Sequence, residues 1–137
     1  MPVIKISYCH PTWPTLRQTP GSLGKWGNYI FILNQDIGEC DAWVVINDLL
    51  NHKESTKCPP NRTLFANEEP PTMKDSPEKF LSQFAIVATC GGYHWKHHDI
   101  REVFPLLTWY VGIDQQELHV PTKKNSVRFT YDDFKKL

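Results

Sequence analysis

Short, apolar, β-prone runs alternate along the chain with polar or proline-containing connections, and this alternation limits the fold more than any other feature. Five such runs lie at residues 3–8, 29–34, 42–48, 63–67 and 85–90. Turn-forming residues bound each run, as is typical of strands. A short helix is expected to open at PEKFLSQF, where Asp75 and Ser76 offer an N-cap and Pro77 suits the first helical turn. The alternation predicts an α/β fold with a mostly parallel, doubly wound sheet. Residues 3–8, 42–46, 63–67 and 85–90 are its expected parallel neighbours.

Length and charge predict one globular domain, 1–137, and argue against two classes of partner. The chain has 15 Lys plus Arg and 15 Asp plus Glu, with no basic patch of the kind that binds nucleic acid. No apolar run approaches the roughly 18 residues that a membrane span needs. The first residues, MPVIKISYCH, read as a strand and not as a secretory leader. We therefore expect a cytoplasmic protein, either free or peripheral to the inner membrane.

The four cysteines are Cys9, Cys40, Cys58 and Cys90, and no two of them form a C-x-x-C motif. In a chain without a secretory leader such spacing indicates reduced, mostly buried thiols.

Polar and aromatic groups directly follow four of the predicted strands. Ligands of parallel α/β sheets bind beyond the carboxyl ends of the strands, so these groups are expected to form one binding rim. The groups are His10 and Trp13, Asn47 and Asp48, Glu68 and Glu69, and the stretch GGYHWKHH.

Glu68 and Glu69 stand side by side at one strand end, before Pro70 and Pro71. Adjacent like charges cost stability, so the pair indicates either a solvated turn or a working site. Successive side chains of an extended segment point to opposite sides, and a residue before proline is held in extended geometry. We therefore expect Glu69, and not Glu68, to point into a crevice between the loop at 10–28 and the segment at 93–99.

The loop that follows the first strand combines flat aromatic rings with polar groups, which is the composition of a sugar-binding site. The candidate residues in it are His10, Trp13, Arg17, Trp26 and Asn28. The alternative for Trp13 and Trp26 is that each packs the loop on the sheet.

The stretch YHWKHHD is a second histidine-rich candidate. A zinc site is not expected there, because adjacent His97 and His98 do not share a tetrahedral site easily and no second ligand pair has the right spacing. We expect His94 and His97 to be exposed loop residues beside the cleft instead.

Five stretches taken in order, KISYCHPTWPT, WGNYIF, LFANEEPPTM, FLSQFAIVATC and WYVGID, give the chain a family resemblance. From Lys5 to about Asp114 it resembles the N-terminal half of bacterial α1,3/4-fucosyltransferase-like glycosyltransferases. The strand followed by Glu-Pro-Pro and FLSQF is the most specific part of the resemblance. That family has the two-lobed GT-B fold, in which Rossmann-like sheets carry helices on both faces.

The resemblance implies that the chain is the acceptor-binding lobe of an inverting enzyme. Glu69 then matches the family's catalytic base, and Glu68 stands where the family usually has glycine. The family's donor lobe, which binds GDP-fucose, has no counterpart in this sequence. We therefore expect no cofactor, no turnover by this chain alone, a glycan acceptor as ligand and docking to a donor lobe.

Two other functions stay open at this stage. One is a stand-alone carbohydrate-binding module that uses the aromatic loop, and the other is an inactive remnant of such an enzyme. For the leading function the expected acceptor-binding residues are His10, Trp13, Arg17, Trp26, Asn28, Glu68, His94 and His97.

Overall fold

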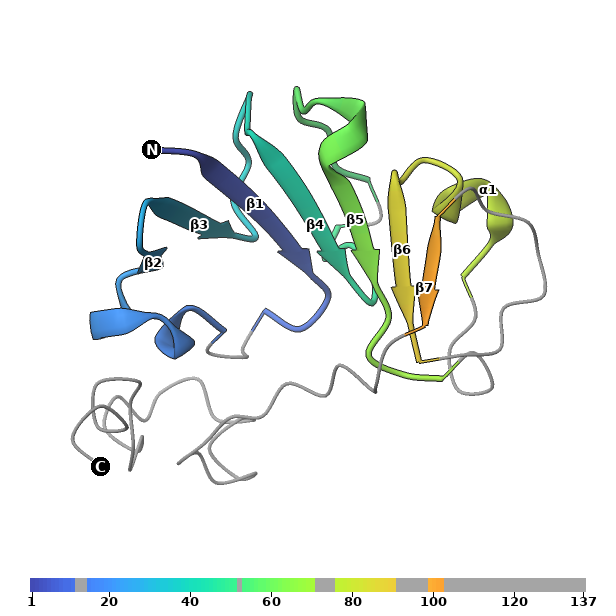
Figure 1. Ribbon diagram of the computed structural model, residues 1–137, viewed down its shortest axis with the longest axis horizontal. Coiled ribbons are helices and arrows are strands. Elements are labelled where there is room, and N and C mark those ends of the chain that lie inside the picture. Colours follow the sequence, from blue (N-terminus) through green and yellow to red (C-terminus); the bar gives the residue numbers. More distant parts are fainter. Residues whose placement is uncertain (12–14, 52, 71–75, 91–98, 103–137) are drawn as a thin grey trace.

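A computed structural model of the chain describes residues 1–11, 15–51, 53–70, 76–90 and 99–102. Its strands form one seven-stranded sheet in the order β2-β3-β1-β4-β5-β6-β7 (Figure 1). All neighbouring pairs are parallel except the antiparallel pair β2–β3. The protein therefore has a mostly parallel mixed sheet, as predicted. The strands are β1 (Val3–Tyr8), β2 (Lys25–Trp26), β3 (Tyr29–Leu33), β4 (Ala42–Ile46), β5 (Thr63–Ala66), β6 (Ile86–Thr89) and β7 (Ile100–Glu102).

The prediction of four parallel neighbours is confirmed, because β1, β4, β5 and β6 lie side by side in that order. Their register places Ser7 beside Val45, Val45 beside Phe65, and Phe65 beside Val87. Paired residues of neighbouring strands project from the same face of a sheet. These residues therefore mark one face, and the residues before and after each of them mark the other.

The apolar core lies on the face marked by Val45. Val45, Phe65 and Val87 pack there against Leu81 and Phe84, and all five side chains are buried. Leu81 belongs to α1 (Glu78–Leu81), and Phe84 lies just beyond that helix. The rings of Phe65, Phe80 and Phe84 lie 5.3 to 5.7 Å apart between centroids, in tilted and edge-to-face arrangements that aromatic pairs favour.

The helical content is smaller than the sequence predicts. α1 begins after Pro77 and ends at Leu81, whereas the sequence predicts a helix that continues toward Phe84. Pro77 is the N-cap, and no side chain caps the helix. α1 is the only α-helix in the described ranges, so the helices expected on both faces of the sheet are not seen there. None of the helices in these ranges is long and apolar enough to cross a membrane. Three short 3-10 helices add to it: η1 (Thr15–Gln18), η2 (Pro20–Ser22) and η3 (Pro60–Arg62).

A short hairpin occupies part of the segment that the sequence predicts as loop. Lys25 pairs with Ile30 and Trp26 with Tyr29, which makes β2 an antiparallel edge strand. Gly24 precedes β2 with φ +65°, and a Cβ there would lie 2.9 Å from the backbone oxygen of Phe31. Only glycine fits this approach without strain. Two paired residues are too few for the sequence to signal a strand.

The strand order changes direction next to β1. The chain passes from β1 to β3 on one side of it, and then returns to β4 on the other side. The chain thus builds the sheet outward in both directions from the boundary between β1 and β4, and the carboxyl ends of these two strands lie side by side there. Ligands of open parallel sheets bind at such a point.

All four cysteines are free: Cys40 is buried and Cys9, Cys58 and Cys90 are partly buried. This agrees with reduced thiols, although only one of the four is fully buried.

Candidate functional site

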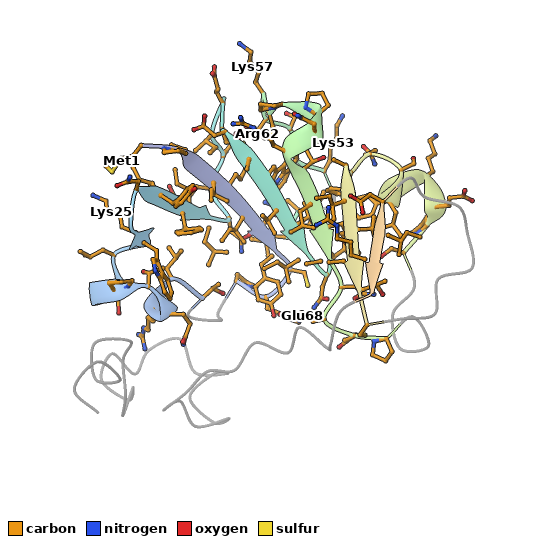
Figure 2. All side chains as sticks on the ribbon, viewed as in Figure 1. Met1, Lys25, Lys53, Lys57, Arg62 and Glu68 are labelled. Carbon is orange, nitrogen blue, oxygen red and sulfur yellow. The ribbon has the colours of Figure 1, made fainter. Side chains whose placement is uncertain are left out.

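The carboxyl ends of β1, β4 and β5 carry a cluster of buried polar side chains. Tyr8 ends β1, Asn47 follows β4, and Asn67 and Glu68 follow β5. Parallel strands bring these positions to one edge of the sheet, and Glu68 lies at that edge in Figure 2. Each of the four residues is buried, and Glu68 is only 4% exposed. The predicted convergence of strand ends is therefore confirmed for these three strands.

Glu68 is the centre of the cluster. Its Oε2 atom accepts a hydrogen bond of 2.7 Å from the hydroxyl of Tyr8 and one of 2.8 Å from Nδ2 of Asn47. The backbone N–H of Glu68 donates to Oδ1 of Asn47 at 2.8 Å. The amide of Asn47 thus holds both the main chain and the carboxylate of Glu68. We call Tyr8, Asn47 and Glu68 the strand-end network.

The backbone supports this network. Asn47 has φ +60°, a left-handed conformation that asparagine tolerates better than most residues. Its own N–H donates to the backbone oxygen of Ala66 at 2.8 Å. Asn34, with φ +50° after β3, accepts from the N–H of Tyr8 at 2.7 Å and donates to its carbonyl at 2.8 Å. Two asparagines that follow strands therefore fix the network: Asn34 holds the backbone of Tyr8, and Asn47 holds Glu68.

The two donors described above, the Tyr8 hydroxyl and the Asn47 amide, are neutral groups. A hydrogen bond to a charged group contributes about 1.5–3 kcal/mol, and removing a partner from a buried polar group costs at least as much. The network is thus a rigid, largely desolvated feature at the edge where a ligand of such a sheet binds.

Glu68 and Glu69 differ in burial at this strand end. Glu68 is enclosed, whereas Glu69 is exposed and its N–H donates to Oδ1 of Asn67 at 3.3 Å. Two residues beyond Ala66, Glu68 continues the row of side chains on the face that carries Tyr8. Whether Glu69 points into the expected crevice stays a prediction, because residues 93–98, the other expected wall, lie outside the described residues.

His10 is brought to the strand-end network. Its exposed ring packs edge-on against Tyr8, with the ring centroids 5.2 Å apart and the planes at 88°. Tyr8 in turn donates to Glu68. Of the predicted acceptor residues, His10 and Glu68 are thus placed together.

Trp26 and Asn28 are not brought to this edge. Both lie on the hairpin that precedes β3, and Ile30 donates to the backbone oxygen of Pro2. From Pro2 to Tyr8 the strand advances by six residues at about 3.3 Å each, so roughly 20 Å separates the hairpin from the network. The expected single cluster is therefore divided between two ends of the sheet.

The other predicted residues are placed only in part. Arg17 is partly buried in η1, which contacts β3. Trp13, His94 and His97 lie outside the described residues, so their expected roles stay predictions. Within the part of the chain that the structure describes, no three His, Cys, Asp or Glu side chains are grouped to hold a metal ion.

Tyr8 and Asn34 are site residues that the sequence analysis missed, and Asn47 was noted only as a strand end. A signal for the asparagines exists, because three of the predicted strands, YIFILN, AWVVIND and TLFAN, run directly into an asparagine. Asparagine tolerates left-handed geometry and offers a donor and an acceptor, which is what strand-end clamps require. No comparable local signal marks Tyr8, because its partner Glu68 is 60 residues away.

No protein-family model, curated protein or solved structure matches this chain. The inferences about function below therefore depend on the sequence and on the geometry of the site.

Proposed function

We propose that the chain is the acceptor-side lobe of an inverting, fucosyltransferase-like glycosyltransferase. Such an enzyme would move L-fucose from GDP-fucose onto a glycan hydroxyl. The strand-end network carries this proposal, since it holds the Glu68–Glu69 pair at the point where the strand order changes direction. That order, read as a doubly wound Rossmann-like sheet, is the architecture that the family resemblance implies for one lobe of a GT-B fold.

The two glutamates take different roles in this proposal. Glu69 is exposed and therefore accessible to an acceptor, whereas Glu68 is buried with its Oε2 atom already accepting two hydrogen bonds. Glu69 acts as the general base and takes the proton of the acceptor hydroxyl as that oxygen attacks the anomeric carbon. The bond from the anomeric carbon to the diphosphate breaks, GDP leaves with the electron pair, and the configuration inverts. Glu68 is a positioning residue that fixes the segment carrying Glu69.

His10 supplies a second group at the same edge. Its ring is exposed and packs against Tyr8, which ties its position to the network. An imidazole beside a carboxylate offers a donor and an acceptor to sugar hydroxyls. In this proposal His10 binds the acceptor next to Glu69, GDP-fucose binds the donor lobe, and no metal or cofactor takes part.

A second candidate function is a carbohydrate-binding module, and the exposed hairpin favours it. Trp26 and Tyr29 lie directly opposite each other on β2 and β3 and are 48% and 49% exposed. Paired, exposed aromatic rings present an apolar surface on which a sugar ring can stack. This surface lies at the other end of the sheet from Glu69, so the two functions predict binding at different residues.

The test is calorimetric titration of the purified chain with neutral oligosaccharides that end in galactose or N-acetylglucosamine, and separately with GDP-fucose. We expect an oligosaccharide to bind and GDP-fucose not to bind. His10→Ala should weaken oligosaccharide binding about fivefold or more, the effect of losing one hydrogen bond. Glu69→Gln should leave the affinity nearly unchanged, because a general base acts in the transition state.

Trp26→Ala is the matched control, since it removes an exposed aromatic ring from the opposite end of the sheet. Loss of binding in Trp26→Ala with no change in His10→Ala would replace the leading proposal by the carbohydrate-binding module. Tight binding of GDP-fucose, or no oligosaccharide binding up to the limit of solubility, would contradict the acceptor-lobe proposal.

A further inference from the structure

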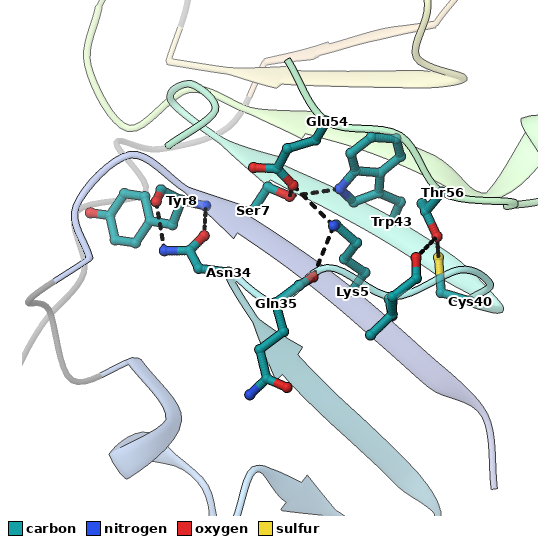
Figure 3. Close-up of polar contacts among 10 residues, drawn as sticks. Lys5, Ser7, Tyr8, Asn34, Gln35, Cys40, Trp43, Glu54 and Thr56 are labelled. Atoms are coloured by element: carbon teal, nitrogen blue, oxygen red, sulfur yellow. Dashed lines mark hydrogen bonds and ion pairs between the residues drawn. The ribbon is translucent and has the colours of Figure 1, made fainter. Parts of the chain in front are cut away.

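A second polar cluster lies over β1 and β4, on the face of the sheet that carries the core. Lys5 and Ser7 alternate on β1 so that both face this side, where Ser7 is level with Val45. Glu54, from the connection between β4 and β5, reaches over them (Figure 3). The cluster therefore joins residues that are about fifty positions apart in the sequence.

Lys5 and Glu54 form a buried ion pair. Nζ of Lys5 lies 3.0 Å from Oε2 of Glu54, and the two side chains are only 2% and 12% exposed. The same Oε2 atom accepts a 2.7 Å hydrogen bond from the hydroxyl of Ser7, which in turn accepts one of 2.9 Å from the indole N–H of Trp43. Nζ also donates to the backbone oxygen of Gln35 at 3.0 Å. The pair is thus held in one geometry by Ser7 and Gln35 directly, and by Trp43 through Ser7.

This ion pair forms the wall of a cavity of about 210 Å³. One water needs only about 10–15 Å³ of such space, so the cavity has room for more than a single buried water. Its outer part is lined by exposed residues, among them Asp36, Asn51, Lys53 and Ser55. The cavity thus combines a fixed polar wall with exposed polar residues at its mouth.

The lining charges disfavour a ligand that carries charge of only one sign. Two cations, Lys5 and Lys53, are matched by two anions, Asp36 and Glu54. An entering anion would meet both carboxylates and a cation would meet both ammonium groups. An apolar ligand would leave the polar wall desolvated without hydrogen bonds, which is costly.

The hydrogen-bonding capacity left in the wall points to the ligand class that remains. An ammonium has three N–H bonds, and Nζ of Lys5 uses two of them in the contacts with Gln35 and Glu54; it also lies 5.4 Å from the centroid of the Trp43 ring. The described contacts of the Glu54 carboxylate all involve Oε2, which leaves Oε1 as an acceptor. A donor beside an acceptor is complementary to hydroxyl groups, because each hydroxyl both donates and accepts.

We propose that this cavity binds a neutral polyhydroxylated small molecule, of the size of a single sugar ring or a cyclitol. Adjacent hydroxyls of the ligand accept from Lys5 and donate to Glu54. The site lies on the opposite face of the sheet from Glu68, and it does not depend on the acceptor-lobe proposal.

The test is titration of the isotopically labelled chain with D-glucose and with myo-inositol, followed by nuclear magnetic resonance. Inorganic phosphate and glycine serve as charged comparison probes. We expect at least one polyol to shift the indole N–H signal of Trp43 and the amide signals of Asn51 and Ser55, with saturation. Phosphate and glycine should leave these signals unchanged.

Two variants report on the wall and on the mouth separately. Glu54→Gln should weaken polyol binding about tenfold or more, because it replaces a charged acceptor. Ser55→Trp should abolish binding by filling the mouth while leaving the ion pair intact, and Ser82→Trp, an exposed site at the end of α1, should bind as the unaltered chain does. If Glu54→Gln does not fold, the loss or retention of polyol binding in Ser55→Trp tests the proposal by itself.

The proposal is overturned if neither polyol shifts these signals, if only phosphate or glycine does so, or if Ser55→Trp binds normally. Shifts confined to His10 and Glu69 would also overturn it while supporting the acceptor-lobe proposal.

Discussion

Glu54 and Glu68 are both largely buried carboxylates, but they lie on opposite faces of the sheet and are joined to different groups of the chain. Glu54 is paired with the ammonium of Lys5, whereas the hydroxyl of Tyr8 and the amide of Asn47 donate to Glu68. A buried carboxylate with a cation leaves an unpaired charge when either partner is lost. Loss of Tyr8 or Asn47 removes a neutral hydrogen-bond donor from Glu68 instead. The two sites should therefore respond differently to the same kind of substitution.

The largest expected effect is that of Lys5→Met, which leaves Glu54 buried without its cation. We expect the free energy of unfolding to fall by about 3–5 kcal/mol, the usual cost of breaking a buried ion pair. Urea denaturation measures it. Lys57→Met is the control, because the Lys57–Glu39 pair is 3.7 Å long with both side chains more than 70% exposed, and its loss should change stability by less than about 0.5 kcal/mol. Equal effects of the two substitutions would show that the Lys5–Glu54 pair is not buried in solution.

Glu68→Ala should have the next largest effect, since it leaves the Tyr8 hydroxyl and the Asn47 amide without their acceptor. We expect a loss of about 2–3 kcal/mol in the free energy of unfolding. Glu68→Gln should cost less, because the amide oxygen can still accept from Tyr8 and Asn47. Glu69→Gln should change stability by less than about 0.5 kcal/mol, as is usual for an exposed side chain. A larger loss in Glu69→Gln than in Glu68→Gln would reverse the burial described for the pair.

Tyr8→Phe isolates one hydrogen bond of the network. The ring and its contact with His10 stay, and only the 2.7 Å bond to Glu68 is removed. We expect a loss of about 1–2 kcal/mol in the free energy of unfolding. The double variant Tyr8→Phe with Glu68→Gln should lose less than the sum of the two single losses, because the residues interact directly. Strict additivity in this double-mutant cycle would contradict the contact.

Cys58 extends the comparison to a partly buried thiol. Burial, and then the neighbouring Cys40, raise the pKa of the Cys58 thiol from 9.0 to about 11. The folded state therefore keeps a proton that the unfolded state loses between pH 9 and 11, so the stabilising contribution of this thiol is present below pH 9 and is lost as the pH rises toward 11.

Alkylation by iodoacetamide gives the readout, since only the thiolate reacts. At pH 8 the folded chain should carry roughly a hundredfold less Cys58 thiolate than the chain in urea, and Cys58 should be modified correspondingly more slowly. Mass spectrometry of the peptide that contains Cys58 measures this rate. Equal rates with and without urea would mean that the thiol is not shielded.

The sequence was sufficient to predict the strands that hold the site, because each is a compact apolar run with clear boundaries. Val3–Tyr8 and Ala42–Ile46 illustrate this, and their parallel pairing follows from the connections between the runs. The sequence was not sufficient for β2, whose two residues gain their strand geometry only from pairing with β3. α1 is shorter than predicted for a related reason. Helix propensity and N-cap signals indicate where a helix starts, but tertiary packing, which the local sequence does not show, decides where it ends.

The sequence was sufficient to predict where the residues of the site lie, but not which of them are buried. Strand ends indicated where Asn47 and Glu68 would meet, because parallel strands end at one edge. Which glutamate is enclosed depends on Tyr8, 60 residues away, and a burial pattern set by distant neighbours is absent from the local sequence. The same applies to Lys5, whose burial depends on its pairing with Glu54. In the sequence, Lys5 is visible only as a polar residue within an apolar strand.

The most direct test of the acceptor-lobe proposal is to map where an oligosaccharide binds on the labelled chain by nuclear magnetic resonance. The probe is the galactose- or N-acetylglucosamine-terminated oligosaccharide that binds best in calorimetry. We expect the largest amide shifts at His10, Asn47 and Glu69, at the carboxyl ends of β1, β4 and β5, with little change at Trp26 and Tyr29. Largest shifts at the hairpin of β2 and β3, or no shifts at all, would contradict the proposal that the strand-end network is an acceptor site.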